Sequence, residues 1–157
     1  MSEAVQLSEE QRRLIEKMGV GGEKNGMPPA PARIMALLMV SPETELTFDQ
    51  VRETLNLSKS ATSNAINMLL TTQKIDYITK PGDRKRYFKN KIGSWKEDVR
   101  SNFQNITRLA DLFEEVLSLR PADTTEFNNK LREIIAFMRF MEEKLPGLYR
   151  QWEESQG

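Results

Sequence analysis

Apolar residues recur at helical spacing near the start of the chain and then give way to a stretch rich in glycine and proline. One predicted helix has Ser8 as its cap, ends at Gly19, and carries on one face Leu7, Gln11, Leu14, Ile15 and Met18. Residues 19–31 contain four glycines and three prolines and are predicted to be a loop. The sequence ARIMALLMV, residues 32–40, is almost wholly apolar, which predicts a short helix at the centre of the core.

Two short helices separated by a brief turn are predicted next. Thr47 and Gln50 have capping-box spacing, and the apolar positions that follow predict a helix that ends near Asn56. Ser58 can cap a second helix that runs to about residue 73. The linker of about three residues between them is typical of a helix-turn-helix.

A β-hairpin is predicted after the second helix. Residues 75–79, IDYIT, and residues 86–90, RYFKN, are rich in β-branched and aromatic side chains, and KPGD provides a turn between them. Tyr87 and Phe88 point to opposite faces of their strand, so one of them is expected to anchor the hairpin to the core. Asp83 is expected either to orient Arg84 or to close the turn.

The last third of the chain predicts two long amphipathic helices that meet at Arg120-Pro121, the second beginning at Asp123 or Thr124. The stripe of the first contains Val99, Phe103, Ile106, Ala110, Phe113 and Leu117, widened by Trp95, Leu109 and Val116. The stripe of the second contains Phe127, Leu131, Ile134, Met138, Met141, Leu145, Leu148 and Trp152, interrupted only by Pro146-Gly147.

These stripes can pack only on each other, or also on the same helices of a second chain. Ile135, Phe137 and Phe140 add apolar surface outside the stripe, which favours a homodimer. The predicted dimerisation residues are Phe127, Leu131, Ile134, Met138, Met141 and Leu145. The expected fold is therefore mainly α with a small β-hairpin wing: a winged helix-turn-helix in residues 1–92 and a helical dimerisation region in residues 93–157.

The charges are balanced overall but distributed unevenly. The chain has 23 basic and 23 acidic residues, yet residues 57–91 contain eight bases and two acids. The remaining segments are correspondingly acidic. Such a segment indicates one surface that faces anions, and nucleic-acid binding depends on local charge of this kind.

The composition argues against an enzyme. The chain has no cysteine and no histidine, which removes thiol and imidazole chemistry and the usual zinc ligands, and no cofactor or metal is expected. Acid pairs such as Glu114-Glu115 point in different directions on a helix and are expected to be solvated. Because no apolar run has the length of a signal peptide or a membrane span, a cytoplasmic protein without membrane contact is expected.

The second helix of the predicted motif has a polar face. Lys59, Ser60, Ser63, Asn64 and Asn67 share it, opposite Ala61, Ala65, Met68 and Leu69. Asparagine can pair with adenine in the major groove, and the cations of the hairpin suit DNA phosphates. The alternatives are a solvated helix face and an edge hairpin whose charges only discourage aggregation.

These residues carry a family resemblance. The span LTFDQVRETLNLSKSATSNAINMLLTTQKIDYITKPGDRKRYFK resembles the winged helix-turn-helix of the MarR superfamily, and GMPPAPARIMALLMV with PGDRKRYF resembles its GbsR-type branch. The resemblance, over about residues 10–100, implies DNA contacts from Ser58, Lys59, Ser60, Thr62, Ser63, Asn64, Asn67, Arg84, Lys85 and Arg86. Position 64 departs from the family, because such helices often carry arginine or lysine there. The resemblance also implies dimerisation through terminal helices, a small-molecule effector, and control of osmolyte or transport genes.

The expected function is that of a transcriptional regulator, most simply a repressor, which binds double-stranded DNA at a pseudo-palindromic operator as a homodimer. The rival is a winged helix that serves as a protein-interaction module in a larger assembly, for which an apolar face on the second helix is expected. Tyr77, Trp95 and Phe103 are candidates for an effector pocket, although aromatic residues at such spacings are also typical of a core.

Overall fold

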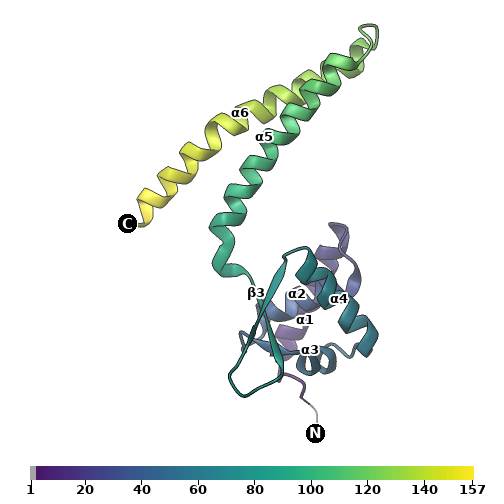
Figure 1. The fold of residues 1–157 in the computed structure, drawn as a ribbon, viewed down its shortest axis with the longest axis vertical. Helices are drawn as coiled ribbons and strands as arrows, with labels where there is room; N and C mark the ends of the chain where they lie inside the picture. The colour runs from purple at the N-terminus through teal and green to yellow at the C-terminus, as the bar shows by residue number, and fades with distance from the viewer. Residues whose placement is uncertain (1–2) are drawn as a thin grey trace. The chain divides into compact units, whose positions relative to one another are not determined.

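The computed structural model describes residues 3–157 and divides into two compact units, Met1–Ile92 and Gly93–Gly157. Unit 1 contains α1 (Glu9–Lys24), α2 (Pro29–Val40), β1 (Leu46–Thr47), α3 (Phe48–Thr54), α4 (Lys59–Thr71), β2 (Ile75–Thr79) and β3 (Arg86–Asn90) (Figure 1). A short 3-10 helix, Ile92–Ser94, leads to unit 2, which consists of α5 (Trp95–Leu119) and α6 (Thr125–Gln156). The predicted class, mainly helical with a small β-sheet wing and long C-terminal helices, is confirmed.

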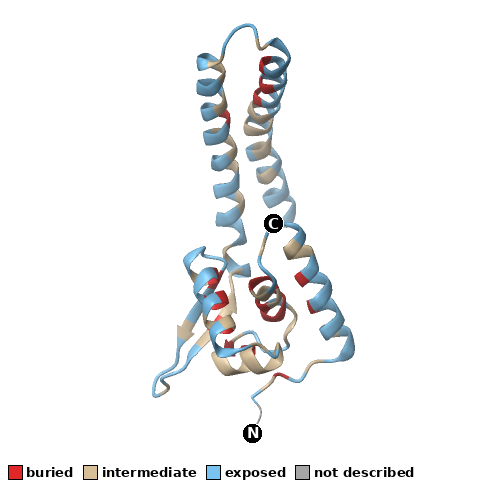
Figure 2. Ribbon diagram, turned by 90° about the vertical axis from the view of Figure 1, so that its right-hand side faces the viewer, coloured by how far each residue is buried: buried red, intermediate tan, exposed pale blue. Residues whose placement is uncertain are grey.

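The core of unit 1 is centred on α2, as predicted. Ile34, Leu37 and Leu38 are buried there, and α2 is the helix with the most buried residues in unit 1 (Figure 2). Leu69 of α4 and Phe88 of β3 are buried in the same cluster. Helix α2 therefore connects the helix-turn-helix and the sheet to one core.

The prediction that α1 ends at Gly19 is wrong, because the helix continues to Lys24. Its glycines allow α2 to approach. A Cβ atom on Gly19 would lie 2.8 Å from Cγ of Arg33, and one on Gly22 would lie 2.9 Å from Cβ of Ala32. The buried face of α1 also differs from the predicted one: Ile15 is buried, whereas the side chains of Leu14 and Met18 are exposed.

The wing is a three-stranded antiparallel sheet of order β1-β3-β2. Both predicted strands have the expected bounds, and Tyr77 of β2 pairs with Phe88 of β3. Strand β1, in which Leu46 pairs with Phe88 and Thr47 with Tyr87, was not predicted from the sequence. Phe88 is the residue that anchors the hairpin, since it is buried in the core.

Unit 2 is an antiparallel helical hairpin in which α5 and α6 lie side by side (Figure 1). The predicted stripe of α5 is confirmed as its inner face, because Ala110 is fully buried and the other five members are half-buried. Helix α6 continues through Pro146, where an interruption was predicted. None of the helices among residues 3–157 is long and apolar enough to cross a membrane.

Candidate nucleic-acid interface

The turn between α3 and α4 is held by backbone hydrogen bonds that a left-handed residue permits. Asn56 has a φ of 50°, a conformation that asparagine tolerates better than most residues. Leu57 N donates to Arg52 O at 2.9 Å and Asn56 N donates to Glu53 O at 3.3 Å, which closes the C-terminus of α3. The chain can then enter α4 at once.

Helix α4 begins at the predicted cap. The Ser58 hydroxyl accepts a hydrogen bond from Ala61 N at 3.1 Å, and its Oγ lies 3.2 Å from Oγ of Ser60. Thr62, predicted to contact DNA, is instead fully buried, and its hydroxyl donates to Ser58 O at 2.9 Å. Thr62 is therefore part of the core and is removed from the candidate interface.

The outward face of α4 is polar, with one exception. Lys59, Ser60, Asn64 and Asn67 are exposed, and Ser63 is half-buried. Met68, predicted to face the core, is also exposed, because Ile66 occupies the buried position beside Ala65 and Leu69. The face that carries the two asparagines is therefore open to solvent.

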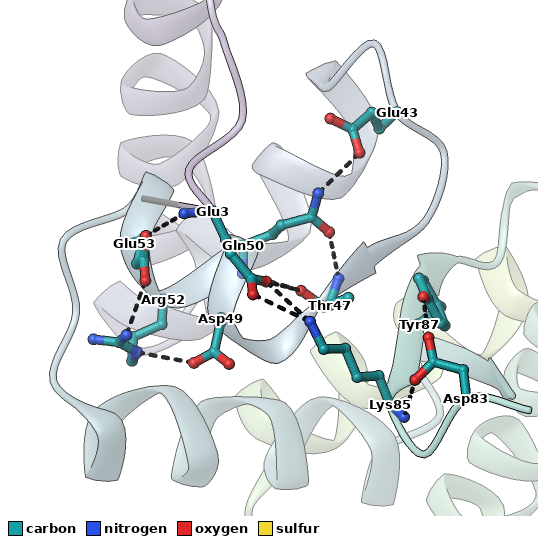
Figure 3. Close-up of polar contacts among 10 residues, drawn as sticks. All are labelled: Glu3, Glu43, Thr47, Asp49, Gln50, Arg52, Glu53, Asp83, Lys85 and Tyr87. Atoms are coloured by element: carbon teal, nitrogen blue, oxygen red, sulfur yellow. Dashed lines mark hydrogen bonds and ion pairs between the residues drawn. The ribbon is translucent and has the colours of Figure 1, made fainter. Parts of the chain in front are cut away.

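The wing turn is closed by Asp83. Asp83 N donates to Lys80 O at 3.0 Å, and Gly82 has a φ of 77°, as the third residue of a type II turn requires. The Asp83 carboxylate accepts from Lys85 N at 2.9 Å and from the Tyr87 hydroxyl at 2.5 Å (Figure 3). Of the two roles expected for Asp83, the structure supports closing the turn.

These hydrogen bonds set the protonation of the pair. The hydrogen bond from the Tyr87 hydroxyl is the larger cause, and the one from the Lys85 backbone N–H the smaller, that lower the pKa of Asp83 below its usual value. The hydrogen bond to Asp83 raises the pKa of Tyr87. At neutral pH the turn therefore holds an ionised carboxylate and a protonated phenol.

The cations of the wing differ in their partners. Lys80 forms an ion pair with Glu45 at 3.2 Å and lies over the Tyr87 ring, and Lys85 forms an ion pair with Glu3 at 3.1 Å. The hydrogen bond to Glu3 raises the pKa of Lys85. Within residues 3–157, Arg84 and Arg86 pair with no acid, and Arg86 lies 4.9 Å from the centre of the Tyr77 ring. The two arginines are thus available for an external anion.

A groove of about 260 Å³ joins α4 to the wing. Ser63 and Asn67 line it from α4, and Lys85 and Arg86 line it from the wing. Sequence reasoning predicted each of these residues separately, and the fold brings the four together. Asp49 of α3, which that reasoning did not consider, lines the same groove and forms an ion pair with Arg52 at 3.4 Å.

Helix α6 has two neighbouring apolar stripes, where the sequence suggested one. The inner stripe faces α5 and contains Leu131, Ile135, Met138, Leu145 and Tyr149, and the polar residues Asn128 and Glu142 lie on the same face; all seven are buried or half-buried. The prediction that Ile135 lies off the seam is wrong, since its side chain is only 8% exposed. The outer stripe contains Phe127, Ile134, Phe137, Met141 and Leu148, all exposed except the half-buried Met141. Of the predicted dimerisation residues, Leu131 is thus engaged within the hairpin, while Phe127 and Ile134 are exposed.

The three candidate pocket residues are divided between the units. Tyr77 belongs to unit 1, where the centre of its ring lies 6.3 Å from the centre of the Phe88 ring. Trp95 packs edge-on against Trp152 in unit 2, with 5.1 Å between the ring centres. Phe103 lines a cavity of about 380 Å³ between α5 and α6. The described residues contain no cluster of three or more acids placed to hold a metal ion.

This arrangement of a helix-turn-helix, a basic wing and a long helical hairpin defines a winged helix-turn-helix protein. A crystal structure of a transcriptional regulator shares the fold, with a TM-score of 0.70 over 92% of this chain and 99% of its own, at 20% identity. A family model described as MmpR5-like MarR family transcriptional regulator matches residues 93–155. The family model thus matches the helical hairpin of unit 2, and the solved structure shares the winged helix-turn-helix fold. The class that this family model describes, a transcriptional regulator, agrees with the prediction that the chain is not an enzyme.

Two further solved structures align too weakly to bear on the fold. The adhesin competence repressor AdcR from Streptococcus pyogenes aligns over 81% of this chain and 92% of its own, at 19% identity and a TM-score of 0.40. A MepR mutant from S. aureus aligns over 82% and 90%, at 14% identity and a TM-score of 0.42. None of the curated proteins matches the chain significantly.

Proposed function

We propose that the chain is a DNA-binding transcriptional repressor that acts as a homodimer on a pseudo-palindromic operator. The observation that carries the proposal is the exposed polar face of α4, with Asn64 and Asn67, next to a wing whose Arg84 and Arg86 have no acidic partner among the described residues. Small polar side chains are weak helix formers, so their collection on one exposed face has a better explanation in base contact than in solvation.

In this proposal α4 enters the major groove. Asn64 and Asn67 present amides that can pair with both N6 and N7 of adenine, while Lys59 and Ser60 approach from the start of the helix. The wing lies along the DNA backbone, where Arg84 and Arg86 contact phosphates and fix the orientation of α4. Ser63 lies between these two groups at the groove that joins them.

The dimer is proposed to form through the outer stripe of α6. Phe127, Phe137 and Leu148 each leave more than half of their surface exposed, at 53%, 62% and 57%. A continuous exposed apolar stripe of this kind is typical of an interface, and a two-fold homodimer is the commonest way to cover it. Such a dimer would place two copies of α4 on two half-sites of one operator.

The proposal also includes two more detailed assignments, a small-molecule effector and membership of the GbsR-type branch. The cavity between α5 and α6 supports a binding site in unit 2, because Val99, Phe103 and Leu145 give it an apolar lining and Arg100 and Arg150 lie at the same cavity. The GbsR-type assignment rests on residues 26–40 and 81–88, whose sequences resemble that branch.

Selection of bound sequences from a random DNA pool with the purified protein tests the proposal. We expect enrichment of a pseudo-palindrome with half-sites about one helical turn apart. A protein that enriches no sequence and binds DNA only weakly at physiological salt would favour the interaction module. That module has little support in α4, where Met68 is the one large apolar side chain exposed.

A further inference from the structure

Lys85 of the wing forms an ion pair with Glu3, which belongs to the N-terminal segment of unit 1. Its Nζ lies 3.1 Å from Oε1 and 3.4 Å from Oε2 of Glu3, so the ammonium contacts both carboxylate oxygens (Figure 3). Eighty-two residues separate the two in the sequence. Both side chains remain about half-exposed, which leaves the pair open to exchange with ions from solution.

The segment that carries Glu3 is fixed to the body of unit 1. Val5 is buried in the core, and its backbone N–H donates to the Thr54 hydroxyl at 2.8 Å. Glu3 N donates to Oε2 of Glu53 at 2.6 Å, and the Thr47 hydroxyl lies 3.3 Å from the Glu3 carboxylate. The carboxylate is therefore placed beside Lys85 by several contacts rather than by the ion pair alone.

Lys85 also lies where an external phosphate would be expected. It lines the groove between α4 and the wing together with Arg86, Ser63 and Asn67. Arg84 and Arg86, on either side of it in sequence, have no acidic partner within residues 3–157. The cation nearest to the N-terminal segment is thus engaged, while its neighbours are available.

We propose that Glu3 is an internal competitor for DNA phosphate: its carboxylate occupies Lys85 and keeps the ammonium from forming a phosphate contact of its own. This inference rests on the proposed DNA-binding function. A phosphate that approaches Lys85 meets the negative charge of Glu3 as well as the ammonium, so the pair contributes less to binding than a free lysine. Glu3 thereby lowers the affinity for all DNA sequences alike, because a phosphate contact carries no base information.

The test compares Glu3→Gln with the parent by measuring DNA affinity across a salt series. Glu10→Gln is the matched control, since Glu10 is exposed on α1, pairs with no wing cation among the described residues, and gives the same change in net charge. We expect Glu3→Gln to bind both selected and random DNA roughly two- to fivefold more tightly at low salt, the range of an exposed ion pair. The slope of log K against log salt should steepen by about one unit, as expected for one added phosphate contact.

Lys85→Met supplies the second arm. In a Lys85→Met background, adding Glu3→Gln should leave the salt slope unchanged, because the lysine on which Glu3 acts is gone. The inference is wrong if Glu3→Gln gains no more affinity than Glu10→Gln, or if its steeper slope persists without Lys85. If the parent binds no DNA, the proposed function fails together with the inference. If the parent binds DNA and Glu3→Gln matches it, only the inference fails.

Discussion

The Tyr87 hydroxyl donates a 2.5 Å hydrogen bond to the carboxylate of Asp83, across the turn that carries the wing cations. The same carboxylate accepts from the backbone N–H of Lys85 at 2.9 Å. These two contacts fix the backbone around Arg84, whose own side chain is left to solvent. The wing therefore offers its arginines from a closed turn rather than from a mobile loop.

The Asp83–Tyr87 pair predicts a pH dependence of the wing. Since the pKa of Asp83 is lowered, the contact is fully present above the ordinary aspartate pKa of about 3.9 and is lost as pH falls through the lower folded value. Since the pKa of Tyr87 is raised, the phenol stays protonated beyond its ordinary pKa of about 10, and the contact is lost only at more alkaline pH. Tyr87→Phe should move the Asp83 pKa upward, as followed by NMR of its carboxyl carbon. Tyr77→Phe is the control, and an Asp83 titration that Tyr87→Phe leaves unchanged would contradict the assignment.

Arg84 and Arg86 are expected to contact phosphates. Replacing both by alanine should weaken binding to all DNA sequences alike and reduce the slope of log K against log salt by about one to two units. The double substitution of Lys130 and Arg132, two exposed cations of α6, is the control and should leave the slope unchanged. Parent-like affinity and slope in the wing variant would refute this role.

The glycines of α1 give a test of the fold that is independent of DNA. Gly22→Ala should destabilise the protein by about 1–3 kcal/mol, because its Cβ would meet the Cβ of Ala32 at 2.9 Å. Gly21→Ala should instead stabilise it by about 0.5–1 kcal/mol, because nothing lies within 4 Å of that position and alanine favours a helix. Urea unfolding measures both free energies. Equal effects would show that α1 and α2 do not pack as described.

Local patterns predicted much of the fold. The capping signals of Ser8, Thr47 and Ser58 each mark a real helix start, and the strands of the hairpin have their predicted bounds. Those signals act within a few residues, so the sequence contains them completely. The predicted fold class follows from them.

The errors fall where long-range packing decides. Gly19 resembles a helix stop, but the approach of α2 makes it a helix-packing position, which no local pattern reveals. Thr62 was expected to contact DNA from the family resemblance alone, yet it lies one helical turn before the buried Ile66 and is itself buried. Glu3 lies 82 residues from Lys85, so their ion pair depends on the assembled unit. Likewise, periodicity alone did not separate the two stripes of α6, because they are neighbours on one helix.

The two stripes of α6 predict how to separate dimerisation from folding. Phe137→Asp places a charge on a side chain that is 62% exposed within one chain, so the fold should survive. In the proposed dimer that charge would be buried without a partner, and sedimentation at micromolar concentration should show a folded monomer. Loss of the second half-site should then lower operator affinity by about 10²- to 10⁴-fold.

The control is Ile135→Ala on the inner stripe. It should lower the stability of the hairpin by about 2–5 kcal/mol, as expected for a buried isoleucine. It should not by itself produce a folded monomer. A parent protein that is already monomeric at micromolar concentration, or a Phe137→Asp monomer that binds the full operator as tightly as the parent, would rule out the dimer.

The most direct test of the central claim, that the polar face of α4 reads DNA bases, is the affinity of Asn64→Ala and Asn67→Ala for selected and for random DNA. Both side chains are exposed, so each substitution should leave folding unchanged. We expect each to cost about 1–3 kcal/mol on the selected sequence and little on random DNA, because a bidentate adenine contact exists only at the correct base. Equal losses on both kinds of DNA, or no loss on either, would contradict the claim.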